Sequence, residues 1–186
     1  MVSMSSLWLP IVISAVLVFI ASSVIHMALP WHKSDFKILP NEENTLVALR
    51  ECSIPPGDYF APRAGSMKDM NTPEFQAKME KGPVVIMTVR PNGQTNMGKL
   101  LGMWFVYLLV VSFFSAYIAG HALPPGTHYL KVFQIVGTAA FLGYAAALWQ
   151  SSIWWSKSWL TNFRSTVDGL IFGLLTAGVF GWLWPR

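Results

Sequence analysis

The sequence predicts an all-α membrane protein with four transmembrane helices and a small α+β soluble insertion between helices 1 and 2. Composition and hydropathy support this fold class. Hydrophobic residues make up 53% of the 186 residues and charged residues only 12%, whereas soluble domains carry about 25% charged residues. Four long apolar stretches have no Lys, Arg, Asp or Glu in their middle, and a membrane-spanning helix needs about 17–25 such residues.

The first predicted transmembrane helix covers residues 7–29. A cleaved signal peptide is the alternative, because the small residues 21–23 follow an apolar core. Signal peptides begin with basic residues and have a short apolar core, but residues 1–6 contain no Lys or Arg and apolar sequence continues to Leu29. We therefore expect a retained helix.

The other transmembrane helices are predicted at residues 98–120, 129–153 and 168–185. The short loop between the second and third helices contains two prolines and a glycine, and its brevity makes these helices an antiparallel hairpin. Residues 154–167 are rich in tryptophan and carry basic side chains, which predicts an interfacial loop.

Between the first two helices, residues 30–97 are rich in Pro, Asn, Asp, Glu and Gly, which predicts a soluble α+β segment. The expected elements are a strand at 36–39, a helix at 41–51 capped by Asn41, an extended loop at 53–63, a helix from Thr72 to Lys81 that ends at Gly82, and a buried strand at 83–89. So small a unit buries little apolar surface alone, so we expect it to lean on the membrane, on the helix ends or on a partner chain.

Small residues recur every four positions in the third and fourth helices. The predicted helix-packing residues are Gly169, Gly173, Ala177 and Gly181 in the fourth helix, and Ala139, Gly143 and Ala147 in the third. This spacing puts each series on one helix face, where small side chains let two backbones approach closely in lipid. We expect these faces to hold the bundle together; the alternative is that one of them docks another chain.

The four histidines invite a metal or haem interpretation. His26 and His32 follow the first helix, whereas His121 and His128 flank the loop after the second, so topology places the two pairs on opposite sides of the membrane. Metal-binding histidines need further ligands and supporting acceptors, and no acidic cluster is evident beside either pair. The sequence therefore predicts no metal site and no cofactor.

Arg164 and Asp168 stand four residues apart just before the predicted fourth helix. This spacing allows an ion pair between them, and Asp168 suits the positive end of a helix. Because His26 is expected at the same end of the bundle, His26, Arg164 and Asp168 form a candidate polar cluster at the membrane boundary, for which structural capping is the preferred interpretation. No nucleophile elbow, phosphate loop or zinc motif is present, so no catalytic residue is assigned.

The net charge of +4 comes from basic residues beside the apolar stretches, which favours contact with the lipid bilayer and argues against nucleic acid as a partner. All of the 13 Lys and Arg except Lys131 and Arg186 lie in or next to the first and third loops. Excess Lys and Arg mark the cytoplasmic side, which predicts a cytoplasmic 30–97 segment. The layout is similar to that of small bacterial multi-pass membrane proteins, which implies the bacterial cytoplasmic (inner) membrane.

Three functions are compatible with this sequence. The first is a non-enzymatic accessory or assembly component of a membrane complex, acting through helix packing with a membrane protein partner or a second copy. The alternative is a small membrane enzyme or lipid-handling protein with a site at the membrane boundary. An oligomeric channel is the third, while the absence of ionisable residues within the helices argues against a coupled transporter.

Overall fold

The computed structural model describes all 186 residues and is 68% helical. Four helices are long and apolar enough to cross a membrane: Trp8–Ala28, Met97–Ala122, Tyr129–Trp155 and Trp159–Trp182. With one two-stranded sheet, they confirm the coarse prediction of four long helices and a small mixed insertion. The chain divides into two compact units, a helical unit of residues 1–36 and 96–186 and an insertion unit of residues 37–95.

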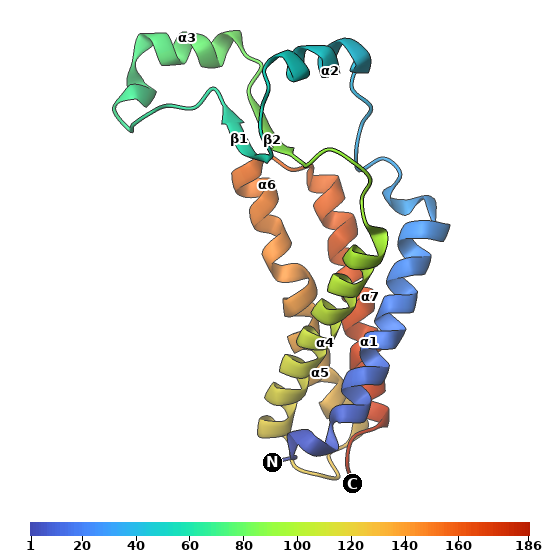
Figure 1. Ribbon diagram of the computed structural model, residues 1–186. Helices are drawn as coiled ribbons and strands as arrows, with labels where there is room; N and C mark the ends of the chain where they lie inside the picture. Colours follow the sequence, from blue (N-terminus) through green and yellow to red (C-terminus); the bar gives the residue numbers. More distant parts are fainter. The chain divides into compact units, whose positions relative to one another are not determined.

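The helical unit is a bundle of elements that run side by side (Figure 1). Its helices are α1 (Trp8–Ser23), which continues into a π-helical turn (Val24–Ala28), α4 (Met97–Ala122), α5 (Tyr129–Ala145), α6 (Trp149–Trp155) and α7 (Trp159–Trp182). Both termini lie at one end, beside the α4–α5 loop (Figure 1). There the Val2 amide donates to the Gly120 carbonyl at 2.7 Å, and the Trp184 indole donates to the Pro124 carbonyl at 3.1 Å.

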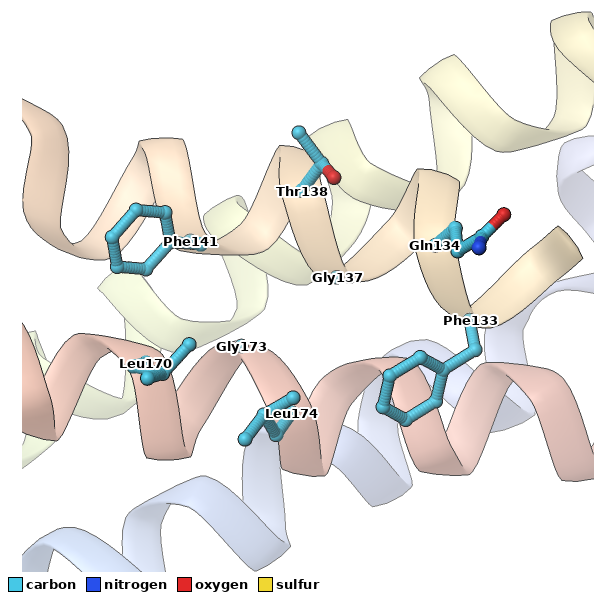
Figure 2. Close-up of a pocket in the computed structure, with 8 residues that line it drawn as sticks. All are labelled: Phe133, Gln134, Gly137, Thr138, Phe141, Leu170, Gly173 and Leu174. Atoms are coloured by element: carbon cyan, nitrogen blue, oxygen red, sulfur yellow. The ribbon is translucent and has the colours of Figure 1, made fainter. Parts of the chain in front are cut away.

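Helix α7 packs closely on α5 through small residues. Figure 2 shows Gly137 of α5 and Gly173 of α7 on the facing sides of the two helices. A β-carbon built on Gly173 would lie 3.3 Å from the Gly137 carbonyl oxygen, and one built on Gly169 would lie 2.8 Å from the Ala145 β-carbon. Contact this close leaves no room for a side chain at Gly169 and little at Gly173, so the two backbones approach each other closely.

The predicted packing residues differ in their surroundings. Gly169, Gly173 and Ala177 are buried, while Gly181 is half-buried against the Tyr129 ring. On α5, Ala139 is half-buried, and Gly143 and Ala147 are exposed. Helix α5 instead buries a neighbouring face, which contains Val132, Val136, Ala140 and Tyr144.

The third predicted helix and the loop after it differ from the expectation. The helix at 129–153 is interrupted by a 3₁₀ turn (Ala146–Leu148), and α6 then continues to Trp155. Helix α7 begins at Trp159, so most of the predicted 154–167 loop is helical. Ser158 caps this start by accepting a hydrogen bond from the Thr161 amide at 3.4 Å. Hydropathy misses the first turns of α7 because they contain polar side chains. The cap residue Ser158 is nevertheless a residue type that favours a helix start.

The insertion unit contains α2 (Glu42–Glu51), β1 (Gly57–Ala61), α3 (Pro73–Lys81) and β2 (Val85–Val89). The strands pair antiparallel, with Tyr59 opposite Met87. As predicted, α3 starts after Thr72, whose hydroxyl accepts from the Phe75 amide at 3.3 Å, and it ends at Gly82, whose φ of +55° suits glycine. No residue of this unit is fully buried.

Four details of the insertion differ from the prediction. No strand forms at 36–39. The predicted loop at 53–63 contains β1, because the prolines on both sides of this strand made the segment resemble a loop in the sequence. The 83–89 strand is not buried, because its sheet has only two strands and no layer covers it. Asn41 precedes α2 with a φ of 51° and makes no side-chain cap, since the left-handed backbone turns the side chain away from the helix start.

Candidate functional site

A cluster of charged and polar side chains lies at the end of the helical unit opposite the termini. His32 stands in a 3₁₀ turn (Pro30–His32) that follows α1, and it joins this turn to α7. Its Nδ1 lies 2.6 Å from Asp35 Oδ2, and its Nε2 lies 2.7 Å from Asp168 Oδ2. Both contacts are short enough to be charge-assisted hydrogen bonds.

Arg164 holds the far side of Asp35. Its Nη1 donates to Asp35 Oδ1 at 2.9 Å and to the Ser34 hydroxyl at 2.8 Å, and its guanidinium lies 5.8 Å from the centre of the Trp31 ring. The ion pair that the spacing allows between Arg164 and Asp168 therefore does not form. Both residues lie well inside α7 rather than before it. Each pairs instead with a residue of the segment that follows α1, Arg164 with Asp35 and Asp168 with His32.

The charges of the cluster compensate one another. Burial of Asp35, whose side chain is 8% exposed, acts to raise the pKa of its carboxyl, but hydrogen bonds and charge from His32 and Arg164 outweigh burial and lower that pKa below the usual 3.8. Asp168 is only 4% exposed, and its one hydrogen-bond partner is His32. His32 therefore bridges the two carboxylates, with one ring nitrogen on each.

His26 lies against His32 from the π-helical turn of α1. The two imidazole rings stack with their centres 4.4 Å apart and their planes 6° from parallel. The Nδ1 of His26 lies 2.9 Å from the Ser22 carbonyl oxygen, so this nitrogen donates and Nε2 is the position left for another partner. One-turn π-helical segments inside α-helices are often found at functional sites.

The expectation that no acidic cluster accompanies the histidines is wrong for His26 and His32, because Asp35 and Asp168 gather beside them. It failed because Asp168 is 136 residues from His32 in the sequence. The other two histidines lie at the opposite end of the bundle, as the topology predicted. There, His121 Nδ1 contacts the Tyr117 carbonyl, and His128 accepts from the Leu130 amide at the start of α5.

A cavity of about 350 Å³ lies beside this cluster. Its wall consists of His26, Trp104, Tyr107, Tyr144, Leu148, Ser165, Asp168, Gly169 and Phe172. Following the direction of each helix, His26 and Ser165 lie toward the cluster end, while Phe172 lies two turns further into α7. The cavity therefore combines an aromatic and aliphatic body with a polar end.

A second hollow, of about 250 Å³, lies over the crossing of α5 and α7 (Figure 2). The hollow is flanked by Phe133, Phe141, Leu170 and Leu174 (Figure 2). Its only polar side chains are those of Gln134 and Thr138. It contains no titratable residue, so none of its side chains is suited to acid–base chemistry.

The structure brings the three predicted residues His26, Arg164 and Asp168 to the same end and adds two that the sequence prediction missed, His32 and Asp35. The only local sign of the missed pair is their three-residue spacing after the first apolar stretch. Comparison of the chain with family models, with curated proteins and with solved structures finds no match.

Proposed function

We propose that this chain is an integral membrane protein that binds an amphipathic molecule from the bilayer, with the polar group of that molecule at His26 and Asp168. The observation that carries the proposal is the cavity beside the charged cluster. Sites for small molecules are typically about 300–1,000 Å³, mostly apolar, with a few polar groups that orient the ligand. A volume of about 350 Å³ with aromatic walls, one histidine and one carboxylate meets this description.

This proposal takes the lipid-handling alternative from the sequence over the accessory function. The accessory function rested on the faces of small residues on the helices. On α7, Gly169 and Gly173 make their close contacts with α5 of the same chain. Gly169 meets Ala145 and Gly173 meets Gly137, so these glycines are already used by the bundle. The cavity, in contrast, has no side chain of the protein filling it.

The test is native mass spectrometry of the full chain released from nanodiscs of phosphatidylethanolamine and phosphatidylglycerol. Ser165→Phe places a ring in the cavity wall, and Ile171→Phe adds the same ring on α7 at a residue outside the wall. We expect one lipid retained by the parent chain and by Ile171→Phe, and its loss from Ser165→Phe. Equal lipid retention by the two variants would show that the cavity is not the binding site.

The insertion unit favours the accessory function as a second candidate. None of residues 37–95 is fully buried, and α2 exposes Leu46, Val47 and Leu49. A fold with no core of its own gains stability from a surface that covers it. If that surface is a partner protein, a stoichiometric complex should be recovered from native membranes in mild detergent, Val47→Glu should release the partner, and Lys68→Glu at the exposed turn before α3 should not.

We also propose that the helical unit spans a bacterial cytoplasmic membrane with residues 37–95 on the cytoplasmic side. The distribution of Lys and Arg supports this orientation. Cys52 is the single cysteine and is exposed, so it reports the side directly. A membrane-impermeant maleimide should label it only after the cells are opened, with a denatured sample as the control for reactivity. Labelling of Cys52 in intact cells would reverse the orientation.

A further inference from the structure

We propose that His26, His32 and Asp168 bind one divalent transition-metal ion, with a coordination position left open toward the cavity. One ring nitrogen of each histidine and one carboxylate oxygen of Asp168 lie within 4.8 Å of one another. Metal–donor bonds of about 2.0–2.2 Å place adjacent donors about 3–3.5 Å apart. Because the two rings stack 6° from parallel, the His26 ring has to turn out of the stack to share an ion with His32, and the ion replaces the 2.7 Å contact between His32 and Asp168.

Both histidines are held in the way that metal-binding histidines are held. Such a residue almost always donates its second ring nitrogen to a carboxylate or a backbone carbonyl, which fixes the tautomer and orients the ring. His26 Nδ1 contacts the Ser22 carbonyl oxygen at 2.9 Å, and His32 Nδ1 contacts Asp35 at 2.6 Å. Both Nε2 atoms are thereby left to act as ligands.

The carboxylates divide into one ligand and one supporting acceptor. Asp35 is committed to Arg164 through Oδ1 and to His32 through Oδ2. Asp168 uses only Oδ2, and its Oδ1 accepts no hydrogen bond although the residue is 4% exposed and lines the cavity. This oxygen is therefore free to bind a cation without giving up a hydrogen bond.

Donor chemistry selects the class of metal. Two imidazoles and one carboxylate suit zinc and ferrous iron, whereas calcium and magnesium prefer sites made of oxygen. Three protein ligands leave at least one position for water or for a substrate oxygen, as in catalytic zinc sites and in non-haem iron sites. An Nε2 that coordinates the ion carries no proton, so the metal takes the place of the hydrogen bond between His32 and Asp168.

The test uses Co²⁺ as the probe on the full chain in detergent, stripped beforehand with a chelator. The visible absorption of Co²⁺ reports its coordination, and displacement by Zn²⁺ gives the zinc affinity. We expect one equivalent bound with a four- or five-coordinate spectrum. His26→Gln and Asp168→Asn should each weaken binding by more than about 100-fold, since loss of a supporting residue alone costs about 10–100-fold.

His121→Gln is the matched control, because the Nδ1 of His121 contacts the carbonyl of Tyr117 four residues earlier, as His26 contacts Ser22, but at the other end of the bundle. It should bind Co²⁺ like the parent chain. Asp35→Asn should weaken binding about 10–100-fold while retaining the spectrum, as a supporting residue does.

Three results would overturn the site: less than one equivalent of Co²⁺ bound by the parent chain, unchanged affinity in His26→Gln, or loss of binding in His121→Gln. His26→Gln is decisive where Asp168→Asn does not fold, because His26 takes no part in the ion pairs that join the turn to α7. Detergent samples without added lipid keep this test separate from lipid binding in the cavity. A parent chain that binds no Co²⁺ overturns the metal site alone, and a parent chain that retains no lipid overturns the proposed function alone.

Discussion

Adding one methyl group to Gly169 or to Gly178 of α7 tests whether close approach to α5 holds the bundle together. The β-carbon of an alanine at residue 169 would lie 2.8 Å from the β-carbon of Ala145 and 3.3 Å from that of Tyr144, so α7 would have to move away from α5. At residue 178 the nearest atom would be the Tyr129 hydroxyl oxygen at 3.8 Å, which is an ordinary contact.

The two substitutions share their effect on the helix itself. Alanine is favoured over glycine in a helix by about 1 kcal/mol, and this gain applies at both positions. Overpacking costs about 1–3 kcal/mol and applies only to Gly169→Ala. The free energy of unfolding should therefore be about 1–3 kcal/mol lower for Gly169→Ala than for Gly178→Ala.

The assay is thermal unfolding in one detergent, followed by tryptophan fluorescence. A difference of 1 kcal/mol shifts the midpoint by about 2–4 °C for a chain of this size. Gly178→Ala should unfold at or above the temperature of the parent chain, and Gly169→Ala several degrees below Gly178→Ala. Equal midpoints for the two variants would refute the claim that the α5–α7 contact at Gly169 is closely packed.

Further predictions follow from single buried polar groups. Asn162 is 0% exposed and donates to the Leu148 carbonyl and to the hydroxyls of Ser151 and Ser152, so Asn162→Ala should lower the free energy of unfolding by about 2–4 kcal/mol in a denaturant titration. The Tyr144 hydroxyl is the one buried side-chain polar atom with no hydrogen-bond partner, so Tyr144→Phe should leave the midpoint unchanged or raise it. Tyr107→Phe should lower the midpoint, because its hydroxyl donates to the Gly143 carbonyl at 2.7 Å; a larger loss for Tyr144→Phe than for Tyr107→Phe would contradict this assignment.

The four long helices were predictable because each contains a long, uninterrupted apolar stretch, which a window moved along the sequence detects directly. The start of α7 was not. Its first turns place the polar residues Thr161 and Asn162 inside and leave Phe163 exposed, which reverses the pattern expected of a soluble helix. Apolar windows therefore located the centre of α7 but not the amphipathic turns at its start.

The candidate site was only partly predictable for a different reason. The predicted topology places His26 and Asp168 at the same end, because two helices separate them and an even number of crossings returns the chain to the same side. Contact between His32 and Asp168 depends on how the turn after α1 folds over α7, and that turn is held by Arg164 and Asp35. These are long-range contacts, for which a single sequence carries no periodic signal.

The charge balance of the cluster explains why it is built from these particular residues. Asp168 is a buried carboxylate beside an apolar cavity, and such a group needs a cation close by. Arg164 does not provide it, because its guanidinium neutralises Asp35. The group that contacts Asp168 is the ring of His32, and a metal ion held by His32 and His26 would take the same place. A purely structural ion pair needs only His32, whereas a metal site also needs His26, whose ring stacks on that of His32 and has to turn for the two to share an ion.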